Sequence, residues 1–114
     1  MALQDRPLSG AVTAANLSAG TIPIAVAATT IHELDENVCS LVDLFFVNGT
    51  GGALVVTVTV NGGTAIALSV AANTIIQFFD AAAFRGSNVA GAGNLITASC
   101  PQAGVSAFGR VVIA

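Results

Sequence analysis

Residues 54–60 read LVVTVTV, residues 61–63 read NGG and residues 64–70 read TAIALSV. Valine alternates with threonine in the first run, and larger apolar side chains alternate with alanine and serine in the second. This period of two predicts two half-buried β-strands, because successive side chains of a strand point to opposite faces. The Asn-Gly-Gly sequence between them tolerates positive φ angles and favours a tight turn. We therefore expect a β-hairpin over residues 54–70.

Further short strands are predicted on both sides of this hairpin. Each combines β-branched or alternating apolar residues with flanking Gly, Asn or Pro turns. They cover residues 21–31, 38–48, 74–79, 94–100 and 105–113. Residues 38–48 are largely apolar on both faces, which indicates a strand inside a double-layered structure. Pro23 favours an edge position for the first of these strands.

Two connecting segments depart from this pattern. Residues 32–37 are polar and acidic, and they predict an exposed loop. Residues 81–84 read AAAF and predict one helical turn before Gly86. The spacing of the strands predicts an all-β fold, as a single antiparallel β-sandwich or jelly-roll-like domain over residues 21–114, with a small barrel as the alternative.

The first 20 residues predict an extended N-terminal arm rather than a further part of the domain. Pro7, Gly10 and Gly20 interrupt a segment of small side chains that has no sustained period. Fully extended, such an arm spans about 70 Å, so we expect it to reach a neighbouring molecule. The alternative is a frayed terminus without contacts. If the arm binds a partner, the expected contact residues are the larger side chains of the arm and of the segment after it: Leu3, Arg6, Pro7, Leu8, Ile22, Pro23 and Ile24.

The chain carries very few charges, and this excludes some functions and favours others. Charged residues make up 8% of the 114 residues, there are three arginines and no lysine, and the net charge is -3. Nucleic-acid binding needs clustered cations, so we expect no nucleic-acid partner. The outward positions of the predicted strands hold Thr, Ser and Ala instead of Lys and Glu. Such neutral faces indicate either a closed homo-oligomer, which we prefer, or attachment to a larger body.

A membrane span, export and metal binding are not expected. The uncharged run at residues 53–79 is long enough to cross a bilayer, but Asn-Gly-Gly interrupts it and its period is two. The segment before Ala25-Val26-Ala27 is too polar for a signal peptide. Cys39 and Cys100 are therefore expected as two buried thiols, although one disulfide stays open as the alternative. With a single His and no paired cysteines, the sequence predicts no metal and no cofactor.

No catalytic constellation is present, and we expect the protein not to be an enzyme. His32 lies beside Glu33 and Asp35, which raises acid–base chemistry or a metal as possibilities, but no nucleophile motif accompanies them. A solvated loop is the expected role of these three residues. The glycines match no phosphate-binding pattern and are expected in turns.

Two groups of side chains predict internal contacts. Asp43 lies within an apolar strand, so we expect it to pair with Arg85 or Arg110 as a structural ion pair. Four phenylalanines are expected as anchors in the core or at a subunit interface: Phe45, Phe46, Phe78 and Phe79.

The order of motifs in residues 29–114 resembles a known class of proteins. These motifs are TTIHEL (29–34), LFFVNGT (44–50), VTVTVNGG (56–63), AANT (71–74), GNLITASC (93–100) and VSAFGRVVIA (105–114). In this order they resemble the small β-structured virion proteins of tailed bacteriophages, most of all the head decoration or cement proteins.

The resemblance implies a structural protein. It would be made in the host cytoplasm, bind the major capsid protein on the outer capsid surface as a homo-oligomer, with a trimer favoured, and stabilise the head. Two alternatives from other classes remain. One is a receptor- or carbohydrate-binding module of the kind found on fibres, and the other is a subunit that assembles into shells or fibres by itself.

Overall fold

The computed structural model describes residues 4–8, 21–34, 39–60, 64–85 and 95–113. This part of the chain forms nine β-strands and no helix. The strands are β1 (Gln4–Pro7), β2 (Ile22–Pro23), β3 (Thr29–Glu33), β4 (Cys39–Asn48), β5 (Leu54–Val60), β6 (Ile66–Val70), β7 (Thr74–Arg85), β8 (Leu95–Ser99) and β9 (Val105–Ile113).

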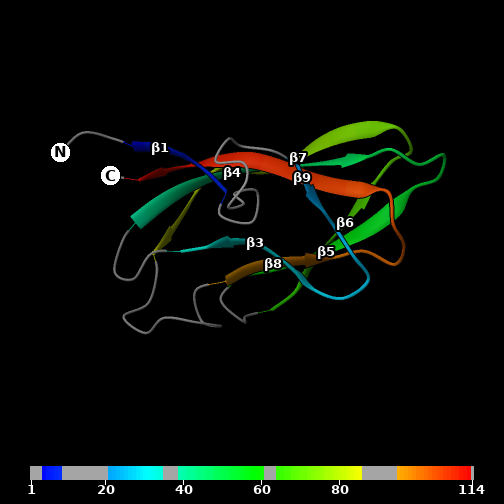
Figure 1. Ribbon diagram of the computed structural model, residues 1–114, viewed down its shortest axis with the longest axis horizontal. Coiled ribbons are helices and arrows are strands. Elements are labelled where there is room, and N and C mark those ends of the chain that lie inside the picture. Colours follow the sequence, from blue (N-terminus) through cyan, green and yellow to red (C-terminus); the bar gives the residue numbers. More distant parts are fainter. Residues whose placement is uncertain (1–3, 9–20, 35–38, 61–63, 86–94, 114) are drawn as a thin grey trace, which may run out of the picture.

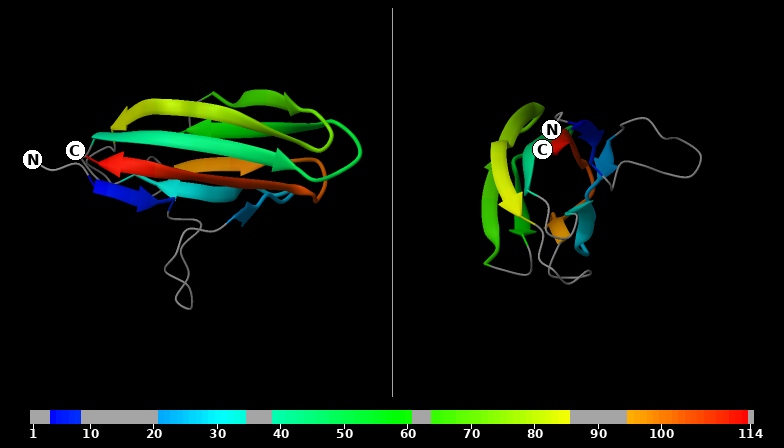
Figure 2. Two further views of the ribbon diagram at one scale, coloured as in Figure 1. Left: turned by 90° about the horizontal axis from the view of Figure 1, so that it is seen from above. Right: turned by 90° about the vertical axis from the view of Figure 1, so that its left-hand side faces the viewer.

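The strands form two antiparallel sheets that pack face to face (Figures 1 and 2). Sheet A has the order β1-β9-β4-β7. The short strand β2 pairs with β9 on the same side as β1, at residues 106–107, whereas β1 pairs at residues 110–113. Sheet B has the order β3-β8-β5-β6. The predicted all-β sandwich is therefore confirmed.

The hairpin expected from residues 54–70 is present as β5 and β6. Leu54 pairs with Val70 and Val58 pairs with Ile66. Val56 and Val58 are fully buried, as the alternation predicted. Ile66 was expected to point inward, yet it is 49% exposed, because β6 is the edge strand of sheet B and no described strand covers its outer side.

Strand β4 is the centre of sheet A and pairs with β9 on one side and with β7 on the other. Its even-numbered side chains are buried between the sheets, with Phe46 among the largest. Its odd-numbered side chains point to the outside of the sandwich. The apolar character of both faces therefore reflects a core on one side and an apolar outer surface on the other.

Strand β7 corrects the expectation of a helical turn at residues 81–84. Ala82 pairs with Val42, and Phe84 pairs with Ser40, so the strand continues to its end without a helix. The helix propensity of alanine is a weak preference that tertiary pairing overrides. Phe84 packs against the core, which favours the extended conformation here.

The chain crosses between the two sheets next to β2. The Ile24 amide donates to the Val105 carbonyl of sheet A at 2.9 Å, and the Cys100 amide donates to the Ala25 carbonyl at 3.0 Å, after which β3 joins sheet B. These two hydrogen bonds close one side of the sandwich.

The hydrophobic core lies between the sheets and includes residues near the start of the chain. It contains a chain of edge-to-face ring contacts from Phe46 through Phe78 and Phe79 to Phe84, with centroids 4.8 to 5.8 Å apart. Leu8 is 0% exposed and belongs to the same core.

Strand β1 pairs with the end of β9, from Gln4 opposite Ile113 to Pro7 opposite Arg110. Residues 4–8 are therefore part of the sandwich and not of a separate arm. The rest of the predicted arm, residues 1–3 and 9–20, lies outside the described residues, and for it the arm stays a prediction.

A buried asparagine closes the end of β4. The Asn48 side chain is 0% exposed. Its Nδ2 donates to the carbonyls of Gly52 at 2.8 Å and Val70 at 3.0 Å, while its Oδ1 accepts from the amide and the hydroxyl of Thr50. Asn48 thus ties the turn after β4 to the end of β6 in the other sheet.

Candidate interaction surface

The outer surface of sheet A is built mainly by its two central strands. Ser40 of β4 pairs with Ile113 of β9, and the register continues without a shift to Asn48 opposite Val105. Because side chains alternate along a strand, one set from each strand points away from the core. We call this set, with two residues of β7, the sheet A outer face: Cys39, Leu41, Asp43, Phe45, Val47, Ile75, Gln77, Ser106, Phe108, Arg110 and Val112.

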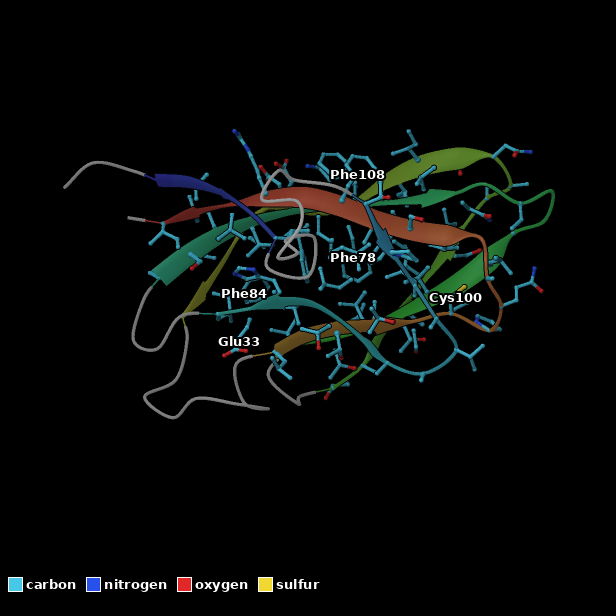
Figure 3. All side chains as sticks on the ribbon, in the orientation of Figure 1. Glu33, Phe78, Phe84, Cys100 and Phe108 are labelled. Atoms are coloured by element: carbon cyan, nitrogen blue, oxygen red, sulfur yellow. The ribbon has the colours of Figure 1, made fainter. Side chains whose placement is uncertain are left out.

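Two aromatic rings form the middle of the sheet A outer face. Phe45 and Phe108 are direct cross-strand partners, and their rings stack with centroids 5.1 Å apart and an interplanar angle of 7°. Both side chains are half-buried. Phe108 lies on the outer side of β9, whereas Phe78 and Phe84 lie between the sheets (Figure 3). The stack therefore presents an aromatic surface to the outside instead of filling the core.

The next pair of residues along the same strands is charged. Asp43 is the direct partner of Arg110, and the Arg110 Nε donates to the Asp43 Oδ2 at 3.1 Å. The Arg110 side chain is 58% exposed and the Asp43 side chain 19%. The sequence left Arg85 and Arg110 open as partners of Asp43, and the structure confirms Arg110. A pair this exposed adds at most about 1 kcal/mol to stability.

Gly109 separates Phe108 from Arg110 and lets β9 lie close to β4. Its φ is +154°, and a Cβ placed there would overlap the Asp43 carbonyl oxygen and stand 2.9 Å from the carbonyl carbon. Only glycine fits this position without displacing a strand. Gly109 therefore allows the outward residues of β9 to lie directly opposite those of β4.

Large apolar side chains are exposed at several places on the molecule. Leu41 and Ile75, which are 40% and 63% exposed, belong to the sheet A outer face. Val55 lies on the outside of sheet B, Ile66 at its edge and Val26 in the segment between β2 and β3. The sheet A outer face combines two of these residues with a half-buried aromatic stack, so it is the most apolar outer surface among the described residues.

The outer surface of sheet B has a different character. Its outward residues on the two inner strands, β5 and β8, and on edge strand β6 are uncharged and mostly small: Val55, Thr57, Thr59, Ala67, Ser69, Leu95, Thr97 and Ser99. The expectation that Thr, Ser and Ala fill outward positions is therefore confirmed for most of sheet B, but it is wrong for sheet A, whose outward positions hold large apolar residues. Among its described residues, the outer face of sheet B lacks the large aromatic and arginine side chains that dominate most binding interfaces.

The residues predicted to contact a partner lie in different places. Leu8, Ile22 and Ile24 are buried in the core of the chain itself, at 0%, 4% and 3% exposure. They would reach a partner only if residues 4–8 and 21–24 left the sandwich. Pro23 is exposed, in the short strand β2 beside Ser106. Arg6 and Pro7 belong to β1, and Leu3 lies outside the described residues.

The exposed polar loop expected at residues 32–37 is wrong for its three described residues, of which Leu34 is only 1% exposed. His32 and Glu33 belong to β3, where they pair with Ile96 and Leu95, and His32 is only 7% exposed. The bulge in β3 between Thr30 and His32 shifts the alternation, which the local sequence did not indicate. Asp35 lies outside the described residues. Within the described segments, no three His, Cys, Asp or Glu side chains gather as metal ligands.

The two cysteines have different environments. Both are described, and both are free thiols. Cys100 is buried, as expected, whereas Cys39 is exposed at the start of β4, so the expectation of two buried thiols is wrong for Cys39. Of the predicted phenylalanine anchors, Phe46, Phe78 and Phe79 pack in or against the core and Phe45 faces outward.

Phe108 is the surface residue that the sequence analysis missed. Its outward position could be read from the alternation of residues 105–113, but its partner could not, because that requires knowing that β9 pairs with β4.

No helix in the described part of the chain has the length and apolarity to cross a membrane. Comparison of the chain with protein-family models, with curated proteins and with solved structures finds no match.

Proposed function

We propose that the protein is a structural component of a tailed-bacteriophage virion, which binds the outside of the capsid as a homo-oligomer and stabilises the head. Its partners are the major capsid protein and further copies of itself. It needs no cofactor and performs no catalysis in this role.

The observation that carries the proposal is the composition of the two outer faces. The sheet A outer face displays a phenylalanine stack, Leu41 and Ile75 around the Asp43–Arg110 ion pair. The outer face of sheet B is uncharged on its described inner strands. A small soluble domain normally carries about 25–35% charged residues on its surface. Apolar and neutral faces of this extent are typical of surfaces that a partner covers.

The compact β-sandwich also supports a structural role. Its core is filled by side chains from both sheets, and Asn48 and the β2–β3 crossing tie the sheets together. The motif order in residues 29–114 resembles that of head decoration proteins, and that resemblance points to the capsid as the larger body.

Binding to purified heads tests the proposal. Purified protein is mixed with heads of the phage that encodes it, the heads are sedimented, and the bound protein is measured as a function of its concentration. We expect saturable binding and a higher temperature of head disruption when the sites are filled. Limited proteolysis of intact decorated heads should remove the protein, because it lies on the outside.

Three results would contradict the proposal. Heads that bind no protein at saturating concentration would exclude the capsid as the partner. Saturable binding to host surface glycans instead would favour a receptor-binding module. Large polymers of the protein alone would favour a shell or fibre subunit. Bovine serum albumin at equal mass concentration is the control for trapping in the pellet.

A further inference from the structure

We propose that the sheet A outer face binds a second copy of this chain, about a two-fold axis that lies between β4 and β9 and runs along these strands. The inference specifies the homo-oligomer of the proposed function as a two-fold pair, in place of the trimer that the resemblance favours, and it rests on the proposed function only for the presence of self-association. It does not require that the oligomer bind a capsid.

The strand register makes the sheet A outer face complementary to itself. Asp43 lies directly opposite Arg110, and Phe45 lies directly opposite Phe108. A rotation of 180° about the proposed axis places β9 of the second copy over β4 of the first at the same height. Each Asp43 then faces Arg110 of the second copy, and each Phe45 faces the other copy's Phe108. A two-fold interface requires such self-complementarity.

The charges favour this axis over a two-fold axis that runs across the strands. An axis that crosses the strands at the level of Asp43 and Arg110 would place the two Asp43 side chains opposite each other and the two Arg110 side chains opposite each other. Like charges in contact across an interface are strongly unfavourable. The axis along the strands instead places an opposite charge from the second copy against both Asp43 and Arg110. Arg110 is 58% exposed and retains area for this contact.

The apolar residues on the same face supply the driving force. Leu41, Val47, Val112 and the stacked rings surround the charged pair, and Ile75 extends the surface onto β7. Aromatic and arginine side chains at the centre of a face, with smaller residues around them, are typical of binding hot spots. The molecule measures 44 × 29 × 26 Å, so one sheet face has room for the about 800 Å² that each partner buries in a standard interface.

Two charge-reversal variants, each studied alone, test whether this face forms the contact between the copies. The first is Asp43→Arg and the second is Arg110→Asp. We expect the wild-type protein to have twice the 11.2 kDa chain mass by light scattering behind a sizing column at micromolar concentration. Either variant alone places like charges face to face in its own pair, so we expect its dimer to dissociate about 100-fold more readily.

Mixing the two variants is the decisive step. In a mixed pair about the proposed axis, each position 43 again faces an opposite charge at position 110 of the other chain, although neither chain has its internal ion pair. We therefore expect dimers to return on mixing. Because the internal pair is absent from both chains, this rescue reports only the contact between copies. Val55→Asp, which adds a charge to the outer face of sheet B, is the matched control, and this variant should form dimers as readily as the wild-type protein.

The outcomes separate this inference from the proposed function. A wild-type monomer or trimer, or two variants that stay monomeric on mixing while circular dichroism shows both folded, would overturn the two-fold pairing. If either variant is unfolded, the doubly reversed chain with both substitutions restores the internal pair and should form dimers with itself; folded monomers would then overturn the inference. Binding to heads is measured separately, so a monomer that binds heads retains the proposed function, and a dimer that does not bind them retains only the inference.

Discussion

Gly109 lies so close to Asp43 on the neighbouring strand that the space for a side chain is occupied by the Asp43 carbonyl group. Its φ of +154° is also one that residues with a Cβ rarely adopt. We expect Gly109→Ala to lower the free energy of unfolding by about 2–4 kcal/mol, because β9 must move away from β4 or the backbone must rotate. Urea denaturation measures the change.

Gly51→Ala is the control for Gly109→Ala. An added Cβ at Gly51 meets no heavy atom within 4 Å. Its effect on the free energy of unfolding should stay within about 0.5 kcal/mol. Equal effects of the two substitutions would show that the close approach of β9 to β4 does not limit stability.

Among substitutions of polar residues, we expect those of Asn48 to lower the free energy of unfolding the most. Asn48→Ala removes four hydrogen bonds and leaves the buried contact to the Val70 carbonyl without a donor, so we expect a loss of about 2–4 kcal/mol in unfolding free energy. Asn48→Asp should be at least as damaging at neutral pH, because a carboxylate would face the Val70 and Gly52 carbonyls. Thermal unfolding followed by circular dichroism compares both with Asn73→Gly, an exposed asparagine at φ +53°. If Asn48→Ala left the stability unchanged, the hydrogen bonds of Asn48 would not contribute to holding the two sheets together.

Leu8 tests whether the N-terminal segment belongs to the domain. The side chain is fully buried, so Leu8→Ala should destabilise the fold by about 2–5 kcal/mol. Val26→Ala, at a residue that is 70% exposed, should change stability by less than about 0.5 kcal/mol. Chemical denaturation of both variants decides the question. An equal, negligible effect at both positions would mean that residues 4–8 do not pack as the structure shows.

Ser40 predicts a gain in stability. Its hydroxyl is buried and has no hydrogen-bond partner among the described residues. A buried polar group without a partner costs about 1–3 kcal/mol, so Ser40→Ala should raise the free energy of unfolding by roughly 1 kcal/mol. Ser69→Ala, on the exposed face of β6, should have almost no effect. A loss of stability in Ser40→Ala would show that the hydroxyl makes a favourable contact.

The parts of the fold that were predicted from the sequence are those with local signals. The alternation in residues 54–70 needs only neighbouring side chains, and it located β5, β6 and the buried valines. Asp43 was predicted to pair because an isolated charge in an apolar strand needs a partner wherever that strand lies. These inferences do not depend on the order of the strands in the sheets.

The errors concern features that depend on distant parts of the chain. Alanines 81–83 favour a helix by themselves, yet pairing with β4 extends β7 through them. His32 was expected in a loop, but pairing with β8 and a bulge bury it. The Phe45–Phe108 stack joins residues 63 positions apart, and no local pattern in either strand identifies the other.

The position of β9 in sheet A also determines when the chain can fold. This strand pairs with β1, β2 and β4, two of which precede residue 24, and it contains the last described residues of the chain. During synthesis those three strands emerge from the ribosome long before their common neighbour does. Sheet A therefore cannot be completed until residues 105–113 have left the ribosome, and the β-rich segments before them remain exposed to other chains until then. Completion of sheet A therefore depends on β9, which is made after all three of its partner strands.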